Sequence, residues 1–472
     1  METFFFVPRS LGIDEYSYGR EQFYADVQAY VRFKTPDVSL ARIVDDDDDQ
    51  SPLNRIREVL EGSDNGDDLD RNKLHHEVRL LGCLIRANLR DDVADVRRKI
   101  ERTRGHAGDT ALADDVRDAV ERVDAETAAV LAAVRQLRPR FLLPRRPNWI
   151  RELYEYLDEY VSISVESYFT AAIDALDAEP TDDFTASRRR LVTAVTAEQR
   201  HRIGAGYPGV LVEASTEGAY VYRKGALKKF MSSVLFLEAK RRPEGRGIAN
   251  IIAGIAAGVA MLFSTVAAIW SQGAYGLNSF PFVVAIVISY VFKDRIKEWL
   301  RAYISGRLTR RLYDRSIEIH DPLENVVVGR CRESFGFLSN GQVPKDVVRI
   351  RHGDSTSILE PETKPELVMR YVKDVTLNGR QIAAVHRRLG DVNDIIRFNF
   401  SSFLVRMDEP VQTVAVYDPK TDHVRRLERP KRYHVNMVML LFADGKQASV
   451  DRFRIILDRR GIQRLQQVDV SA

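Results

Sequence analysis

The spacing of apolar residues predicts helices through most of the first two hundred positions. Apolar side chains recur at the period of one helix face, and charged residues occupy the opposite face. The clearest runs are LHHEVRLLGCLIRANLRDDVADVRRKI, DDVRDAVERVDAETAAVLAAVRQL, NWIRELYEYLDEYVSISVESYFTAAIDAL and SRRRLVTAVTAEQRHRI. Long helices joined by short connections are typical of an all-α bundle. We therefore predict a helical domain over residues 1–203.

One acidic insertion interrupts this pattern. Residues 42–70 carry 11 acids against 3 bases and include the run Asp45–Asp49. Such a charge density predicts a flexible, solvated loop. Cation binding is the alternative, but the sequence lacks the alternating ligands and the closing glutamate of an EF-hand loop.

A long uncharged stretch predicts a membrane hairpin. Ile248–Trp270 holds 23 residues without a charge, and as a helix it would reach about 34 Å, more than the ~30 Å of a hydrocarbon core. A second apolar run, Phe280–Phe292, is short and approaches the lower limit only with Leu277 and its uncharged neighbours. The alternative is a buried hairpin in a large soluble core, which the flanking cations disfavour. The predicted bounds are 247–292 for the transmembrane hairpin, with spans at about 248–270 and 276–292.

Basic residues flank both ends of this hairpin, and its connecting loop has none. The positive-inside rule then places both termini in the cytoplasm, in a multi-pass protein of the inner, cytoplasmic membrane. The bilayer and its anionic headgroups are the expected partners of these cations. The residues that we expect at the membrane surface are Lys228, Lys229, Lys240, Arg241, Arg242, Lys293, Arg295 and Lys297.

Two glycines in the first span, Gly254 and Gly258, form a GxxxG pattern. Small residues let two helix backbones approach closely. The pair therefore predicts a contact either with the second span or with another copy of the chain in a homo-oligomer. The sequence has no acid, base or histidine between Gly247 and Phe292, which excludes a proton relay inside the hairpin.

The segments on either side of the hairpin are predicted to be amphipathic. Residues 204–246 combine a β-hairpin at 209–224 with a helix whose apolar stripe includes Leu227 and Met231. Residues 293–313 continue the second span as a further helix. We expect the two helices to leave the membrane side by side as a short stalk; the alternative is that each lies flat on the inner leaflet.

Turn dipeptides and branched residues predict antiparallel β structure after residue 313. Asn340-Gly341, Asn378-Gly379 and Asp444-Gly445 separate short runs of branched and aromatic residues. TVAVYDPKTDHVRRL is typical of a hairpin with a longer turn. We predict a β-rich domain over 314–472, either a sandwich or a barrel, which the hairpin at 209–224 joins. The fold class is therefore an α+β membrane protein with an N-terminal all-α domain, a two-helix transmembrane hairpin and a C-terminal antiparallel β domain.

Composition changes this picture little. The formal charge of +3 divides into −6 before Lys293 (38 bases, 44 acids) and +9 from Lys293 onward (33 bases, 24 acids). This mild basic bias is compatible with anionic lipid or with nucleic acid and selects neither. The two cysteines show no metal or redox spacing, and the first residues lack the basic and long apolar regions of a signal peptide.

No motif in the sequence specifies a reaction, a cofactor or a metal. GAGYPG (204–209) matches GxGxxG, but a predicted helix precedes it and a strand follows it, the reverse of a dinucleotide site. HHE (75–77) lacks the i, i+4 spacing of zinc hydrolases, so its histidines are expected at the surface or at a cap. HGDS (352–355) and RRLGDVND (387–394) are expected to be polar turns. The basic patch at 422–434 is expected to be a solvated β-turn, with lipid headgroups, or less favourably nucleic acid, as the alternative.

These features favour a membrane-anchored sensing, scaffolding or docking protein whose cytoplasmic domains bind a protein partner or a ligand. One alternative is a subunit of an oligomeric pore that its cytoplasmic domains gate. The other is a membrane-tethered enzyme whose site gathers scattered residues such as His352, Asp354, His386 and Asp391.

Overall fold

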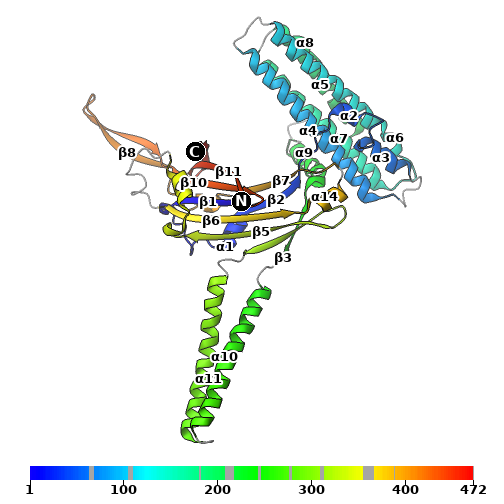
Figure 1. Ribbon diagram of the computed structural model, residues 1–472. Helices are drawn as coiled ribbons and strands as arrows, with labels where there is room; N and C mark the ends of the chain where they lie inside the picture. The colour runs from blue at the N-terminus through cyan, green and yellow to red at the C-terminus, as the bar shows by residue number, and fades with distance from the viewer. Residues whose placement is uncertain are drawn as a thin grey trace.

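The protein consists of a central antiparallel sheet, a helical bundle at one end of the sheet, and a two-helix hairpin that projects from it (Figure 1). The predicted α+β class, with a helical N-terminal region and a β-rich C-terminal region, is confirmed. The structure is a computed structural model, and it describes residues 1–62, 69–104, 110–179, 182–207, 217–242, 246–275, 279–308, 313–353, 366–386 and 388–470.

Eight antiparallel strands form the central sheet, in the order β12-β11-β10-β1-β6-β5-β4-β3. The sheet is open, so the predicted sandwich or barrel is wrong. Short helices and a small two-stranded sheet cover its faces in place of a second full sheet. The strands are β1 (Glu2–Pro8), β3 (Glu238–Arg242), β4 (Arg315–His320), β5 (Val327–Leu338), β6 (Glu366–Leu377), β10 (Tyr433–Ala443), β11 (Lys446–Asp458) and β12 (Gly461–Val468).

The first strand of the chain, β1, lies in the middle of this sheet between β10 and β6. Its consecutive aromatic residues are buried on both faces because successive side chains of a strand alternate. Phe4 and Phe6 pack with Val347 of α12 (Lys345–His352) on one face. Phe5 stacks on Phe398 on the other face. The prediction that residues 1–203 are helical is therefore wrong at this strand.

A smaller layer covers the second face of the sheet. β2 (Val27–Phe33) pairs with β7 (Val392–Phe398), so a second early segment is also strand and not helix. Two short helices, α1 (Arg20–Asp26) and α15 (Ser401–Leu404), pack beside this pair. Phe23 of α1 stacks on Phe335 of the large sheet with ring centroids 3.8 Å apart.

The turn predictions have mixed outcomes. Asp444-Gly445 joins β10 to β11 with positive φ at both residues, as a two-residue hairpin turn requires. The hairpin of β8 (Val411–Asp418) and β9 (His423–Pro430) is also confirmed, and it projects as an isolated arm (Figure 1). Asn378 instead caps a helix, α14 (Gly379–Val385), where its side chain accepts a hydrogen bond from the Gln381 N–H. Short 3-10 turns occur at Arg9–Leu11, Asp182–Phe184, Ser233–Leu235 and Asn340–Gln342.

Four long helices form the bundle and coincide with the four runs of helical periodicity. α7 packs against α4 and α8, and α5 also packs against α4. The apolar core of the bundle continues into one end of the sheet, where Phe33, Ile319 and Ile382 join it. The bundle helices are α4 (Arg71–Thr103), α5 (Thr110–Gln136), α7 (Asn148–Asp177) and α8 (Thr185–Ala205), with the short α2 (Leu40–Ile43), α3 (Pro52–Glu61) and α6 (Arg138–Phe141) beside them.

The acidic insertion is only partly a loop. The helix α3 occupies its centre and buries Leu53, Ile56 and Leu60 in the bundle core. Asp70, at its end, caps α4 by accepting a hydrogen bond from the Lys73 N–H at 3.0 Å. The helical spacing of apolar residues within the insertion therefore decides its local structure, despite its high acidic charge. Residues 63–68 lie outside the described part of the chain.

The segment before the hairpin differs from the prediction. A helix, α9 (Glu217–Ser232), occupies the second half of the β-hairpin predicted at 209–224, and the first half lies outside the described residues. Leu227 and Met231 of α9 are buried in the bundle core, where the Cys83 thiol donates to the Met231 carbonyl at 3.3 Å. Strand β3 then leads into the hairpin, so the predicted stalk of two amphipathic helices is wrong on this side.

The hairpin itself consists of α10 (Arg246–Ala274) and α11 (Phe280–Leu308), which pack against each other. α11 runs without a break through both the second predicted span and the predicted exit helix. Both ends of the hairpin meet the sheet, and its tip points away from the sheet and the bundle (Figure 1).

Candidate functional site

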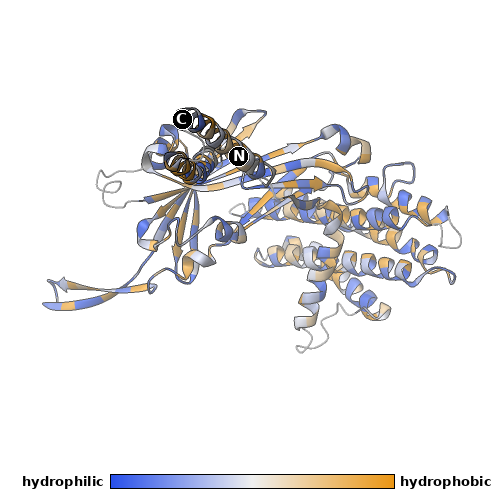
Figure 2. Cartoon of the chain, turned by 90° about the horizontal axis from the view of Figure 1, so that it is seen from below, coloured by the Kyte–Doolittle hydropathy of each residue, from blue (hydrophilic) through white to orange (hydrophobic). Residues whose placement is uncertain are grey.

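The feature that sets this molecule apart is the apolar outer surface of the α10–α11 hairpin. Leu262 and Trp270 of α10 are 66% and 68% exposed, and Phe280 at the start of α11 is 82% exposed. Soluble monomers rarely expose a contiguous apolar patch larger than a few hundred Å². Elsewhere, hydrophobic and hydrophilic residues are interleaved along the strands and helices (Figure 2). The surface also includes Ile251, Ile255, Val259, Met261, Phe263, Val266 and Ile269 of α10, and Val283, Ile286, Val287, Ile288, Val291 and Phe292 of α11.

Small residues form the contact between the two helices. Ala256 and Ala260 of α10 are fully buried and lie one turn apart, on one face of the helix. Ser271 of α10 and Ser289 of α11 are buried as well, and their hydroxyls have no hydrogen-bond partner among the described residues. The hairpin therefore has small side chains inside and large apolar side chains outside. Close packing through small residues is typical of helix pairs in lipid.

The glycine pair does not contribute to this contact. Gly254 and Gly258 are exposed, and a methyl group added at either would meet nothing within 4 Å beyond its own helix. The structure thus excludes packing of Gly254 and Gly258 against α11, because Ala256 and Ala260 occupy that face. Contact with a second copy of the chain is the interpretation that stays open.

The two helices differ in apolar length. Among the described residues, one stretch is long and apolar enough to cross a membrane, Ala253–Ala274 of α10. Only 11% of it is buried, unlike the core helix of a soluble protein. α11 starts at Phe280 and meets its first charge at Lys293, after 13 residues. Of the second span predicted at 276–292, the structure shows residues 280–292 as helix, and residues 276–278 lie outside the described part.

The eight cations predicted at the membrane surface fall into three separate groups. Lys228 and Lys229 belong to α9, which lies beside the bundle and away from the hairpin (Figure 1). α9 packs against α4 and α7 of the bundle, and the charge of Arg86 on α4 is the main cause that lowers the pKa of Lys228. That these two lysines lie at a membrane surface with the rest stays a prediction. The β3 group is Lys240, Arg241 and Arg242, and the α11 group is Lys293, Arg295 and Lys297.

The β3 and α11 groups lie at different levels of the hairpin. Lys240, just before α10, donates to the Asn325 side chain at 2.7 Å. On α11, the Lys293 ammonium lies 3.6 Å from the ring centroid of Tyr290, and Arg295 pairs with Glu298 at 3.2 Å. The α11 group thus lies partway along the hairpin and not at its base.

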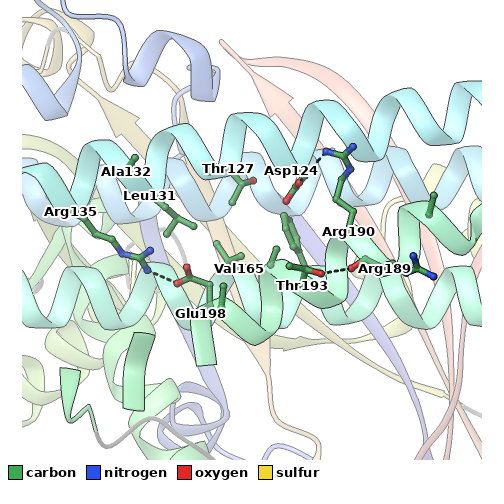
Figure 3. A pocket seen from close by; sticks show the side chains of 15 residues that line it. Asp124, Thr127, Leu131, Ala132, Arg135, Val165, Arg189, Arg190, Thr193 and Glu198 are labelled. Atoms are coloured by element: carbon green, nitrogen blue, oxygen red, sulfur yellow. Dashed lines mark hydrogen bonds and ion pairs between the residues drawn. The ribbon is translucent and has the colours of Figure 1, made fainter. Parts of the chain in front are cut away.

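A second candidate site is an open groove of about 810 Å³ between α5, α7 and α8 of the bundle (Figure 3). Leu131 and Val165 line its middle, and ion pairs stand at both ends. Arg190 lies 3.7 Å from Asp124 at one end, and Arg135 lies 2.7 Å from Glu198 at the other. The lining thus combines an apolar middle with charged ends and the hydroxyls of Thr127 and Thr193.

A buried polar network fixes the Arg135 end of this groove. Asp158 of α7 accepts hydrogen bonds from His201 and Tyr207, both at 2.8 Å, and lies 3.5 Å from Arg135. Burial disfavours the charge of Asp158, but the hydrogen bonds from His201 and Tyr207 outweigh it and keep the pKa of Asp158 below 3.8. The network joins α5, α7 and α8, so the groove is pre-formed.

Histidines predicted at the surface instead lie at the junction of bundle and sheet. His76 of α4 stacks on His386, with ring centroids 5.5 Å apart, and His386 pairs with the buried Asp321. The Glu77 carboxylate next to His76 binds Arg388. Burial, with added repulsion from His386 and Arg388, lowers the pKa of His76 to about 4. The sequence spacing gave no signal of this cluster, because its members come from three distant segments.

The residues considered for an enzyme site do not gather in one pocket. His386 is buried at the junction, whereas Asp391 is exposed and lies 3.9 Å from Lys34. Asp394 pairs with Lys373, and His352 ends the distant α12. Asp354 and Ser355 of HGDS lie outside the described residues. Within the described part of the chain, no group of three or more histidine, cysteine or acidic side chains is placed to hold a metal ion.

Two further motifs also have structural explanations. Gly206 of GAGYPG ends α8 with a left-handed φ of 70°, so the first residues of the motif close a helix; residues 208 and 209 lie outside the described part of the chain. The basic patch at 422–434 supplies β9, whose arm points away from the hairpin (Figure 1).

Comparison of the chain with protein-family models, with curated proteins and with solved structures found no match.

Proposed function

We propose that this chain is a membrane-anchored docking or scaffolding protein, held to the inner membrane by the α10–α11 hairpin. The exposed apolar surface of the hairpin carries the proposal, because lipid chains would remove that surface from water. Helices also satisfy their own backbone hydrogen bonds, which a segment in hydrocarbon requires.

The geometry of the hairpin supports one orientation. Both of its ends meet the sheet, so bundle and sheet lie on the same side of the bilayer. The cations of β3 and α11, together with a connecting segment that has none, favour the cytoplasmic side. Both termini are then cytoplasmic.

The groove between α5, α7 and α8 supports docking as the task of the anchored part. Its apolar middle and charged ends suit an amphipathic segment of a partner protein. The dispersal of His352, His386 and Asp391 argues against the enzyme alternative.

A subunit of an oligomeric pore is the second candidate. The observation in its favour is the outward position of Gly254 and Gly258, which leaves a small-residue face of α10 open to another copy.

Membrane fractionation and protease protection test the proposal together. We expect the full chain to stay in the membrane pellet after an alkaline carbonate wash and to be released by detergent. A tag at either terminus should resist protease added to intact cells and be cleaved after lysis. Recovery of the chain in the soluble fraction would overturn the anchoring, and cleavage in intact cells would overturn the orientation.

A further inference from the structure

The charges on α11 set a short hydrophobic length for the hairpin. From Phe280 at the tip to Phe292, α11 has 13 uncharged residues, which cover about 20 Å. An ordinary hydrocarbon core is about 30 Å thick. The next two turns carry five charged residues. Lys293 is half-buried, and the other four are exposed: Asp294, Arg295, Lys297 and Glu298.

α10 cannot compensate for this shortness, because the helices pair tip to tip. Lys293 lies 13 residues from the start of α11, and the residue 13 positions before the end of α10 is Met261. By the same count, Glu298 is level with Ala256. The charged turns of α11 therefore lie beside the half of the apolar stretch Ala253–Ala274 that is nearer the sheet. A hairpin immersed over the whole of that stretch would take five charges into hydrocarbon.

The direction of the side chains makes this conflict harder to relieve. The Cα–Cβ bonds of a helix tilt toward its N-terminus, and the N-terminus of α11 is at the tip. Long side chains on α11 consequently lean toward the membrane interior and not toward the near surface. Lys293 shows this directly, since its ammonium lies 3.6 Å from the ring centroid of Tyr290, one turn closer to the tip. Snorkelling of these cations to the near headgroups is therefore disfavoured.

We propose that the hairpin is matched to a thin bilayer, with a hydrocarbon layer of about 20 Å in place of about 30 Å. The inference rests on the proposed anchoring function and specifies its lipid partner, namely bilayers of short acyl chains or bilayers that are locally thinned. The base of the hairpin then lies at headgroup level. Trp299 and Tyr303, both exposed on α11 there, are residue types that favour this interface.

A series of vesicles tests the inference on the full-length protein. Phosphatidylcholine vesicles with a fixed minor fraction of phosphatidylglycerol would carry myristoleoyl, palmitoleoyl, oleoyl or erucoyl chains. We expect the fraction of protein that floats with vesicles to be highest with myristoleoyl chains and about tenfold lower with erucoyl chains. The cost of binding rises with every Å by which the hydrocarbon layer is thicker than the apolar part of the hairpin.

Two variants of α11 sharpen the test. The first variant replaces all five charged residues, Lys293, Asp294, Arg295, Lys297 and Glu298, by Leu. The uncharged run then ends only at Arg301, so flotation should be best with oleoyl chains. The control exchanges Lys293→Arg, Arg295→Lys and Lys297→Arg, which keeps the charges in place and should leave the optimum with short chains.

The outcomes separate the two proposals. Failure of the wild-type chain to float with any vesicle would overturn the anchoring function itself. Flotation that is independent of chain length, or that is best with oleoyl or erucoyl chains, would overturn the thin-bilayer inference and leave the anchoring intact. An optimum that the leucine variant does not move would overturn it as well.

Discussion

The helices α7 and α10 have nearly the same length but opposite surfaces. α7 has 30 residues and buries large apolar side chains such as Leu153, Leu157 and Phe169. α10 has 29 residues, buries Ala256 and Ala260, and exposes side chains as large as Leu262. Because apolar side chains leave water when they can, the outer surface of α7 suits water, whereas that of α10 suits lipid, as the proposed anchor requires. The direction of the large side chains, and not helical length, distinguishes an anchor from a core.

The largest expected difference in stability is between the same Leu→Ala substitution on α7 and on α10. Leu157→Ala removes a fully buried side chain and should lower the free energy of unfolding by about 2–5 kcal/mol. Leu262→Ala, on the outward face, should change it by no more than about 0.5 kcal/mol. Guanidinium unfolding in mild detergent measures both: Trp149 fluorescence reports on α7 in a chain with Trp270 and Trp299 replaced by Phe, and Trp270 fluorescence reports on α10 in a chain with Trp149 and Trp299 replaced by Phe. A loss of about 2 kcal/mol or more for Leu262→Ala would mean that protein, and not lipid, covers this face.

A smaller difference in stability is expected between substitutions on the two faces of α10 that carry small residues, the Ala260 face and the Gly258 face. Ala260→Leu overfills the contact with α11 and should destabilise the hairpin by about 1–3 kcal/mol. Gly258→Leu enters open space and should leave the hairpin stable. Trp270 fluorescence during unfolding, in a chain with Trp149 and Trp299 replaced by Phe, measures these changes.

Native mass spectrometry of the same two variants tests the homo-oligomer. If Gly258 packs against a second copy, Gly258→Leu lowers the subunit count while Ala260→Leu does not. A wild-type monomer would remove both the glycine contact and the pore alternative.

The smallest effect is a pH dependence that belongs to the bundle and not to the hairpin. Burial is the main reason that the pKa of His75 and of His76 falls to about 4, from 6.5. Between these values the unfolded chain binds protons that the folded chain excludes, so stability falls as the pH drops from 6.5 toward 4. We expect the melting temperature to fall by a few degrees over this window. His76→Phe should flatten the fall, and an unchanged slope would contradict the buried position of His76.

The sequence predicted those elements whose signal is local. The four bundle helices and the two hairpins at 411–430 and 433–458 carry their periodicity or turn residues within one segment. Asn378-Gly379 misled because the same dipeptide serves a hairpin turn and a helix cap. The prediction for 217–224 was wrong because EGAYVYRK combines β-favouring residues with a helical continuation toward Met231.

The sequence predicted that the hairpin exists but not which of its residues face inward and which face outward. The uncharged run identified α10, but nothing local indicates that Gly254 faces outward while Ala256 faces α11. The position of Lys228 also depends on such contacts: it is close to the hairpin in sequence, yet its helix packs on the bundle. Contacts between distant segments, such as His76 with His386, leave no trace in spacing.

The central position of β1 has a consequence for biosynthesis. β1 pairs with residues 366–372 and 436–440, which the ribosome makes after the whole hairpin. At 5–20 residues per second, the strand's exposed phenylalanines wait roughly 20–90 s for their partners. The hairpin has by then left the ribosome. The centre of the sheet thus closes late in synthesis, and under the proposed anchoring it closes on a chain whose hairpin has had time to enter the bilayer.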